Sequence, residues 1–482
     1  MKKKVIITII IIIICGIFHV SEAQEMLGLT NTSYSGLSGI SLNPANISQN
    51  SKNTEIGILT INVSGENNIF YIKKDEYKFT RFFEKHPNFP KHGINNNFAT
   101  YFLSDNKHKR FVLFNLRIAG PSVLFHIRHH SFAFQTALRS AFSIYNLPIP
   151  LAANIHTGFI VRPQFNAGEF KSAGLLWGET NLSYSYKTAR YTNVFAFGIT
   201  LKKLSGYGGA YLINNNMIYG AVSNATVVIN NFNGEYAYSL PLDYSNNEFS
   251  TNNILKGSGF GFDVGFVFLK RIKKQLAFKN TYKNKYKLGV SLLDIGKIKF
   301  KQKVNKYIFD NSNTYWPNAD SFMYDNLFEF DSTVISNFNI PTGNIYRNSD
   351  FSIFLPSALS VQFDYNIYNN WYVNTTVMQA FNIGKVGVRR ISFISLIPRY
   401  ETKNFAIQMP MTYYEKQYTR IGLAVRIFRL TIGTEKITGF FNYDDFTGLD
   451  FYLSLIFNAS DFKSLKNIYI FKRKPPCYDL KF

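Results

Sequence analysis

The chain has 482 residues, of which 46% are hydrophobic and 17% aromatic, and it carries a formal net charge of +23. This composition allows a large buried apolar surface, either in two or three soluble domains or in one large barrel. After residue 23 no apolar run reaches the roughly 18 residues of a membrane-spanning helix, so helical spans are excluded. The positive charge does not indicate a nucleic-acid partner, because no recognition motif accompanies it. A lysine-rich composition explains it without any partner.

Residues 1–23 have the features of a secretory signal peptide. Residues 2–4 are all lysine, and Val5 to Ile14 is apolar apart from Thr8. Ser21-Glu22-Ala23 places small residues where signal peptidase prefers them. We therefore expect an exported chain that begins at Gln24 after cleavage.

Residues 1–23 have two alternative interpretations, a retained membrane anchor and a lipoprotein signal. A retained membrane anchor would need a longer apolar run than the one present. A lipoprotein could be modified at Cys15, but Ile14 stands where a small residue is expected. Removal of residues 1–23 leaves Cys477 as the remaining cysteine, so an intramolecular disulfide is excluded.

The rest of the chain shows the period-two alternation of β-strands. Thr54 to Val63 predicts a strand with a bulge, and residues 73–110 predict a long loop. Phe111 to Ile118 and Val123 to Ile127 predict two strands separated by Gly120-Pro121. Further strands are predicted at residues 132–142, 182–186, 194–204, 260–268, 286–293, 359–365, 371–378, 392–399, 405–409, 422–428, 430–434 and 449–457.

This pattern fits either a soluble sandwich or a membrane barrel. Strand lengths of about 9 to 11 residues suit a tilted crossing of a bilayer. Large aromatics at the strand ends are typical of membrane-interface girdles, and short turns alternate with long insertions such as residues 307–348. We therefore predict an all-β fold, a transmembrane antiparallel β-barrel of about 14 strands with an N-terminal plug segment.

The plug is predicted from Gly28 to Ile47, which is too polar for a core strand and too rich in Gly and Asn for a stable helix. Glycines alternate with aromatics near Gly265, which leaves room for a plug or another backbone. The predicted organisation is a signal peptide (1–23), a plug or hatch (24–50), the barrel (51–457) and a basic periplasmic tail (458–482).

Charged residues opposite the apolar face are expected to line the lumen, because basic residues facing lipid cost about 2 to 4 kcal/mol at the midplane. These charges have two interpretations, a salt-bridged lumen that holds the plug or a path for an anionic or amphipathic solute. The lumen-facing candidates are Arg117, Arg128, Arg139, Lys202, Asp263, Arg399 and Glu401.

Several short motifs resemble a family of uncharacterised outer-membrane proteins. They are Asn43-Pro44-Ala45, the GPS at residues 120–122, LLDIG at 292–296, PRYE at 398–401 and GLAVRIFRLTIGTEKI at 422–437. That family is distantly similar to long-chain fatty-acid transporter barrels and to the barrel that shuttles cargo in type IX secretion.

The resemblance implies a 14-stranded barrel whose N-terminal hatch contains Asn43, Pro44, Ala45 and the adjacent Asn46. It covers nearly all of the chain after the signal peptide. No stretch matches the ligand-contacting residues of the fatty-acid transporters, so the resemblance does not imply fatty-acid specificity.

The sequence offers no catalytic, metal or cofactor motif. His126, His129 and His130 lack nearby Cys, Asp or Glu and are interpreted as a solvated turn with one lumen histidine rather than as a metal site. An outer-face phospholipase would need paired His and Ser, which the sequence does not single out.

We therefore expect a non-enzymatic barrel in the cell outer membrane that admits a hydrophobic or amphipathic solute. The alternative is a structural or secretion-accessory barrel that binds a periplasmic or surface protein. The expected partners are outer-membrane lipid, which the basic stretch Leu269 to Lys287 could contact as an exposed loop, and a hydrophobic small molecule, with no nucleic acid.

Overall fold

The structure is a computed structural model. It describes residues 25–49, 54–74, 101–104, 110–157, 159, 161–250, 253–276, 279–320, 324–415, 417–441 and 443–459.

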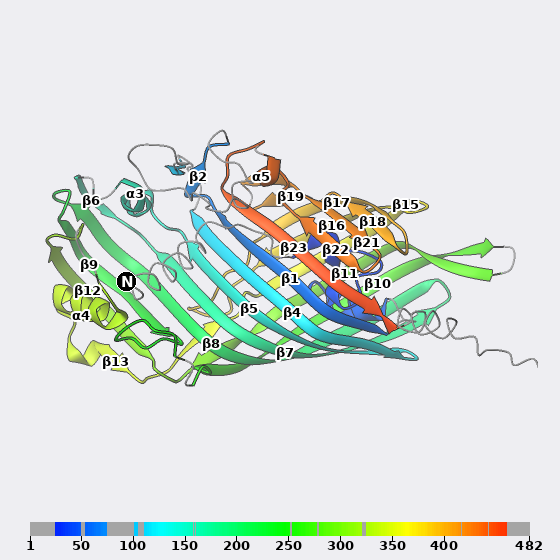
Figure 1. The fold of residues 1–482 in the computed structure, drawn as a ribbon, viewed down its shortest axis with the longest axis horizontal. Helices are drawn as coiled ribbons and strands as arrows, with labels where there is room; N and C mark the ends of the chain where they lie inside the picture. Colours follow the sequence, from blue (N-terminus) through cyan, green and yellow to red (C-terminus); the bar gives the residue numbers. More distant parts are fainter. Residues whose placement is uncertain are drawn as a thin grey trace, which may run out of the picture.

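The wall is a closed antiparallel barrel of 14 strands, which confirms the predicted fold class and strand number (Figure 1). It closes because the last strand pairs with the first along Glu55 to Glu66. In order around the wall the strands are β1 (Glu55–Asn67), β4 (Phe111–Ile127), β5 (His130–Tyr145), β7 (Phe170–Arg190), β8 (Asn193–Ala221), β10 (Gly257–Leu276), β11 (Lys279–Phe300), β14 with β15 (Phe351–Phe354, Ala358–Tyr368), β16 (Trp371–Ala380), β17 (Phe393–Glu401), β18 with β19 (Phe405–Gln408, Met411–Tyr414), β20 with β21 (Tyr418–Ile421, Leu423–Ile427), β22 (Leu430–Thr434) and β23 (Gly448–Asn458).

The two rims of the barrel differ. At one rim, here called the short-turn rim, neighbouring strands are joined by turns such as residues 191–192 and 369–370. The opposite rim, called the long-loop rim, carries the larger connections (Figure 1, left and top). Its additional elements are β2 (Phe70–Ile72), β3 (Tyr101–Leu103), α3 (Ile149–Thr157), β6 (Arg162–Asn166), β9 (Val227–Ser239), β12 (Asn305–Trp316), α4 (Leu327–Phe338), η4 (Thr342–Asn344), β13 (Ile345–Arg347) and α5 (Thr438–Phe441). The barrel therefore has the asymmetry expected from the sequence.

The N-terminal segment, residues 25–49, contains three short helices. They are α2 (Leu27–Thr30), η1 (Ser38–Ser41) and η2 (Pro44–Ser48). Among the described residues, none of the helices combines the length and the apolar character needed to cross a membrane.

Side chains alternate between the two faces of the wall, as the period-two pattern predicts. Large apolar side chains such as Leu182, Phe197 and Leu201 are exposed on the outside. Polar and charged side chains such as Arg139 and Lys202 are buried on the inside. The outside of the wall is thus apolar and the lumen polar, the distribution of a membrane barrel.

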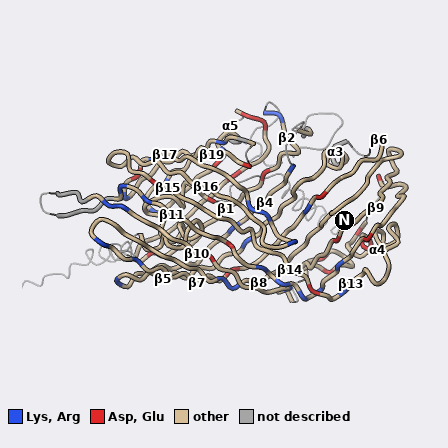
Figure 2. Tube along the Cα trace, turned by 180° about the vertical axis from the view of Figure 1, so that it is seen from behind, with Lys and Arg blue, Asp and Glu red and all other residues tan. Residues whose placement is uncertain are grey.

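Three local predictions were wrong. Gly120-Pro121 does not end a strand, because β4 runs through it with a register shift between Ala119 and Ser122. β8 continues well past its predicted end at Leu204, because β7 and β9 pair with it up to the long-loop rim. The basic stretch 269–287 is mostly the paired ends of β10 and β11 rather than a loop (Figure 2).

Some predictions fall outside the described residues. These are the signal peptide, most of residues 73–110 and the tail from residue 460 onward. The predicted bulge in the first strand is confirmed by a register shift between Gly57 and Leu59.

Candidate functional site

The N-terminal segment lies against wall strands from different parts of the barrel (Figure 1, blue). η2 contacts β5, β7, β8 and β10, whereas α2 contacts β21 and β22. All of its side chains are buried except Ser33, Tyr34, Ser41 and Gln49. The segment is therefore bounded by wall strands on both of its sides.

Asn43 is the most highly connected residue of this segment. Its backbone is extended, and its Oδ1 accepts a hydrogen bond from the N–H of Ala45 at 3.0 Å, which caps η2 with Pro44 at the first helical position. Its Nδ2 donates to the carbonyls of Phe266 at 3.1 Å and Val290 at 3.3 Å, and to Gln362 Oε1 at 3.1 Å. One side chain thus joins the segment to β10, β11 and β15.

Glycines on the wall make room for this approach. A Cβ at Gly198 would overlap the backbone of Pro44 and Ala45, and one at Gly265 would overlap the side chain of Asn43. Gly198 and Gly265 are paired across β8 and β10, so together they form a patch of the inner wall that carries no side chains. The prediction that an inner-face glycine leaves room for an approaching segment holds at Gly265, where side-chain atoms of Asn43 and Pro44 occupy the space.

The other two predicted hatch residues are also buried. Ala45 packs with Val194, Ala196, Val267 and Leu269, all from β8 and β10. Asn46 Nδ2 donates to the carbonyl of Gly39 at 3.2 Å, so it links η2 to η1. Whether this segment acts as a plug stays a prediction.

A cluster of buried charges crosses the lumen and centres on Asp294. Arg139 donates to Asp294 at 3.0 Å and to Glu179 at 2.9 Å. Lys202 pairs with Asp294 at 2.5 Å and with Asp263 at 2.8 Å. The sequence reasoning picked out Arg139, Lys202 and Asp263 for the lumen, and the structure brings these three together.

The same cluster connects the N-terminal segment to the long-loop rim. Arg390, from the loop between β16 and β17, pairs with Asp294 at 3.2 Å and also with Glu25. Glu25 is buried within the first described turn of the segment. The segment and this loop therefore meet through one arginine.

A second cluster surrounds Arg399, which is 1% exposed. Arg399 makes a forked contact with Asp364 at 2.6 and 2.9 Å and bonds Glu401 at 2.8 Å. Glu401 in turn accepts from the backbone N–H of Ser33 at 3.2 Å. Both predicted residues thus lie in the lumen, one of them in contact with the N-terminal segment.

The remaining two lumen-facing candidates, Arg117 and Arg128, lie in different environments. Arg117 donates to Gln135 at 3.0 Å on the neighbouring strand. Arg128 does not line the lumen and that prediction was wrong, because β4 ends at Ile127 and Arg128 is exposed in the turn with φ 54°.

Four charged residues that form ion pairs in these two clusters were not predicted from the sequence: Glu25, Glu179, Asp364 and Arg390. Glu179 was missed because the strand was predicted to begin at residue 182, although the alternation can be followed back to it. Glu25 and Arg390 lie outside strands, where no periodicity marks a buried charge.

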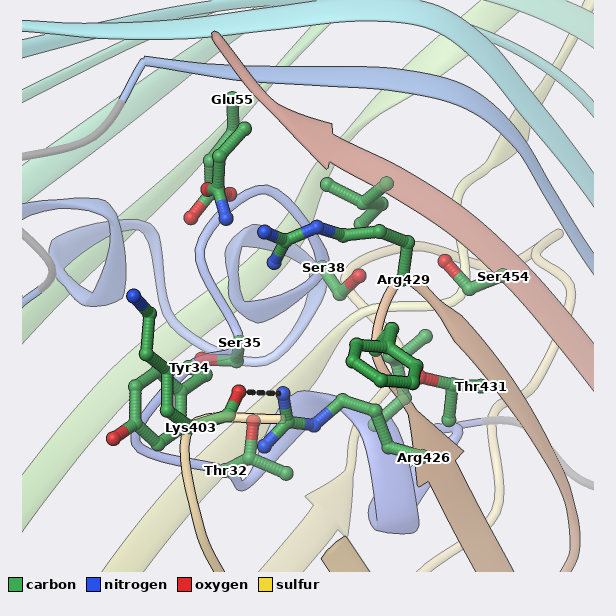
Figure 3. A pocket seen from close by; sticks show the side chains of 14 residues that line it. Thr32, Tyr34, Ser35, Ser38, Glu55, Lys403, Arg426, Arg429, Thr431 and Ser454 are labelled. Atoms are coloured by element: carbon green, nitrogen blue, oxygen red, sulfur yellow. Dashed lines mark hydrogen bonds between the residues drawn. The ribbon is translucent and has the colours of Figure 1, made fainter. Parts of the chain in front are cut away.

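A small cavity opens between the N-terminal segment and the wall near the short-turn rim (Figure 3). Its volume is about 70 Å³. Its lining combines basic groups, one carboxylate, one amide, hydroxyls and apolar carbons, from Leu29, Thr32, Tyr34, Ser35, Ser38, Glu55, Lys403, Arg426, Phe428, Arg429, Thr431, Ser454, Ile456 and Asn458.

Arg426 is the best-defined basic group of this cavity. It donates to the carbonyls of Lys403 at 3.0 Å and Thr402 at 2.8 Å, and its guanidinium lies 5.0 Å from the centre of the Tyr34 ring. Its Nε has no hydrogen-bond partner among the described residues. Burial and the charge of Glu401 raise the pKa of Tyr34, while Arg426 lowers it. The cavity therefore offers a cationic edge beside a neutral phenol.

A larger pocket of about 370 Å³ lies at the long-loop rim and is almost wholly apolar. Wall residues Phe142, Gly174 and Leu212 form one side, and alternation places them on the face opposite Arg139 and Glu179. β9, β12 and α4 form the other side, with Tyr236, Phe309 and Phe338 among the lining residues. The pocket is thus continuous with the outer apolar face of the wall.

A buried carboxylate holds α4 over this pocket. Asp331 of α4 accepts hydrogen bonds from Tyr236 at 3.0 Å, Tyr238 at 2.5 Å and Tyr307 at 2.5 Å. Burial, together with the charge of Asp331, raises the pKa of Tyr236, which keeps its hydroxyl protonated as a donor. Three strand tyrosines on β9 and β12 therefore anchor the helix.

Comparison with solved structures finds outer-membrane channels of low similarity. The Pseudomonas putida toluene transporter TodX is 9% identical, with 91% of this chain and 97% of that chain covered and a TM-score of 0.39. The Ralstonia pickettii toluene transporter TbuX is 9% identical, with coverages of 92% and 99% and a TM-score of 0.31. A Pseudomonas aeruginosa FadL homologue is 10% identical, with coverages of 91% and 99% and a TM-score of 0.24.

A search of curated proteins finds no match. A family of unknown function, DUF5723, matches residues 44–434, which is most of the chain and includes Pro44 of the N-terminal segment. The chain therefore belongs to the DUF5723 family.

Proposed function

We propose that this protein is an outer-membrane barrel that admits a hydrophobic or amphipathic solute, with the N-terminal segment as a plug that moves during passage. The closed wall and its apolar outer face support a membrane location. Export through a cleaved signal peptide would deliver the chain to the cell outer membrane.

One observation carries the proposal. β23 pairs with β1, so the wall closes without any help from residues 25–49. In the described part of the chain, no residue of this segment is a strand partner of the wall. The segment is held by side-chain hydrogen bonds, ion pairs and packing, and it can shift without opening the barrel.

The two cavities indicate the chemistry of the solute. The apolar pocket under α4 suits a hydrophobic body of modest size. The small cavity beside Arg426, Arg429 and Lys403 suits an anionic group with a short apolar part. An amphipathic anion satisfies both environments.

Removal of the segment tests the plug directly. A variant that keeps residues 1–25 and lacks residues 26–49 should form the same barrel and conduct ions in planar bilayers far better than the intact protein. A heat-modifiable band on gels shows that the variant has folded. A folded variant with no gain in conductance would contradict the plug role.

The solute chemistry is tested with two probes that differ in one group. Butyrate carries a carboxylate, whereas 1-butanol is neutral. Arg426→Gln should weaken binding of the carboxylate probe by about tenfold, because a charge-assisted contact of about 1.5 kcal/mol is lost. Binding of the alcohol should not change. If Arg426→Gln weakened binding of both probes equally, the prediction that the solute carries an anionic group would be wrong.

The exposed Lys74, near the long-loop rim, gives a charge-matched control. The variant Lys74→Gln should bind both probes like the intact protein. A loss in this control would show that general surface charge, rather than the cavity, sets the affinity.

The alternative role is a barrel that binds a protein partner without transport. The wall extension of β9, β12 and α4 beyond the barrel offers a surface for it. Crosslinking in cells should then recover a partner that is lost when residues 305–347 are shortened, with conductance of the plug-deleted barrel unchanged.

A further inference from the structure

Four side chains form a continuous row across the outer face of the barrel. Lys203 of β8 is the strand partner of Phe260 in β10, which pairs with Lys297 in β11, and Lys297 pairs with Phe354 in β14. The Nζ of Lys297 lies 5.6 Å from the centre of the Phe354 ring. We call this set the lysine–phenylalanine row.

The row points away from the lumen. The neighbours Lys202, Leu204 and Ile298 are buried on the inner side, and Lys202 is bound there to Asp263. Side chains alternate along a strand, so Lys203 and Lys297 project outward, where both are exposed. Phe260 is 78% exposed. Exposure of this extent for an aromatic ring indicates contact with lipid rather than with water.

Apolar rungs lie between the row and the short-turn rim. Each rung crosses β8, β10 and β11, beginning directly below the row. The rungs are Leu201–Phe262–Ile295, Ile199–Val264–Leu292, Phe197–Phe266–Val290 and Phe195–Phe268–Leu288. From the last rung to the row is a distance of about 27 Å along a strand, or about 21 Å along the membrane normal at a tilt of about 40°, which is close to the apolar band of about 25 Å in such barrels. The row therefore marks the edge of the band on the long-loop side.

The charges of the row are not neutralised within the chain. Lys299, one rung further out, forms an ion pair with Asp350. Lys203 and Lys297 have no carboxylate within ion-pair distance in the part of the chain that the structure describes. Two cations at the edge of an apolar band, with an exposed ring between them, have the charge and position that suit an anionic headgroup.

Geometry allows both lysines to reach the same group. Two strand spacings separate Lys203 from Lys297, or about 10 Å between their backbones. Each lysine side chain extends about 6 Å and carries three donors on a rotatable ammonium, so the two can converge on one phosphate. Acyl chains attached to that phosphate would lie on the apolar rungs.

We infer that the row binds a phosphate group of a membrane lipid in the leaflet at the long-loop rim, with Phe260 and Phe354 packing against its glycerol or sugar backbone. The inference rests on the proposed membrane location but not on any transported solute. It assigns an annular lipid site to the outside of the wall, separate from the cavities described above.

Native mass spectrometry of the delipidated barrel in detergent tests the site. The probes are dimyristoyl phosphatidic acid, which carries a phosphomonoester, and dimyristoylglycerol, which has the same chains and no phosphate. The intact protein should prefer phosphatidic acid. The double variant Lys203→Gln/Lys297→Gln should weaken that binding by about 30-fold, at roughly fivefold for each interfacial lysine. Dimyristoylglycerol binding should stay the same.

Controls separate the possible outcomes. Lys73→Gln/Lys74→Gln removes two charges elsewhere and should keep the preference. Inorganic phosphate at the same concentration should not displace the lipid, because it lacks the acyl chains. Retained preference in the row variant, or displacement by inorganic phosphate, would overturn the inference.

Membrane location is read separately, by insertion of the intact barrel into vesicles and by its heat-modifiable band. A barrel that fails to insert refutes the proposed location and, with it, this lipid site. A barrel that inserts but shows no phosphate preference refutes the lipid site alone.

Discussion

Substitution of Asn43 should release the N-terminal segment without opening the barrel. Asn43→Ala removes the cap of η2 and the three donated contacts to Phe266, Val290 and Gln362. Asn43→Ser keeps a side-chain oxygen that can cap the helix but loses the donor to the wall. The two variants therefore separate the local cap from the contact with the barrel.

The size of each effect follows from the contacts. Loss of the cap costs about 1 kcal/mol. The amide has two N–H groups shared among three acceptors, so the wall contacts contribute about 2 kcal/mol. We expect the free energy of segment release to fall by about 3 kcal/mol in Asn43→Ala and by about 2 kcal/mol in Asn43→Ser, or about 150-fold and 30-fold in the release equilibrium.

Hydrogen exchange followed by mass spectrometry measures this release. Peptides within residues 25–49 should exchange faster in the order Ala, Ser, wild type, whereas peptides from β11 should keep their protection. Asn230→Ala on β9 is the matched control, because its side-chain amide donates to Gln164 and to no other residue in the part of the chain that the structure describes. Unchanged exchange of the segment in Asn43→Ala, or equal loosening of β11, would refute the reasoning.

Three further predictions follow from single contacts. Gly198→Ala should weaken the packing of the N-terminal segment against the wall by about 1–3 kcal/mol, which should appear as faster hydrogen exchange of residues 43–48. The control is Gly343→Ala, because a Cβ at Gly343 would have no heavy atom within 4 Å, and this variant should leave the exchange unchanged. Asp331→Asn should weaken the anchoring of α4 by about 1–2 kcal/mol, and cleavage of residues 317–344 by protease should then speed up; cleavage at the wild-type rate would count against the anchor. Asp294→Asn removes one ion-pair partner from each of three buried cations and should lower the free energy of unfolding by about 3–5 kcal/mol. Asp350→Asn breaks an ion pair at the surface and should lower it by at most about 1 kcal/mol. Both changes are measured from the unfolding midpoint in urea.

The period-two pattern was enough to predict the wall. Alternation depends on the pleat of each strand alone, so Phe197, Leu201 and Phe266 could be assigned to the outer face without any knowledge of neighbours. The final strand and the bulge of β1 followed from the same local signal. The inward direction of Arg139, Lys202 and Arg399 was predictable because a basic side chain is costly in lipid.

Strand ends were less predictable. β8 extends past Leu204 because β7 and β9 supply hydrogen-bond partners there, and a partner strand cannot be read from the sequence of β8. Arg128 was misplaced for a related reason. A shift of one residue in the end of β4 moves it from a wall position to an exposed turn.

The composition and alternation of the chain were sufficient to predict an all-β barrel with a polar lumen and an N-terminal segment of unusual composition. Only the tertiary structure brought Asp294 between Arg139, Lys202 and Arg390, and only strand register aligned Lys203, Phe260 and Lys297. These residues are far apart in the sequence. Their meeting depends on the closure and relative shift of neighbouring strands, which are properties of the whole barrel rather than of any one segment.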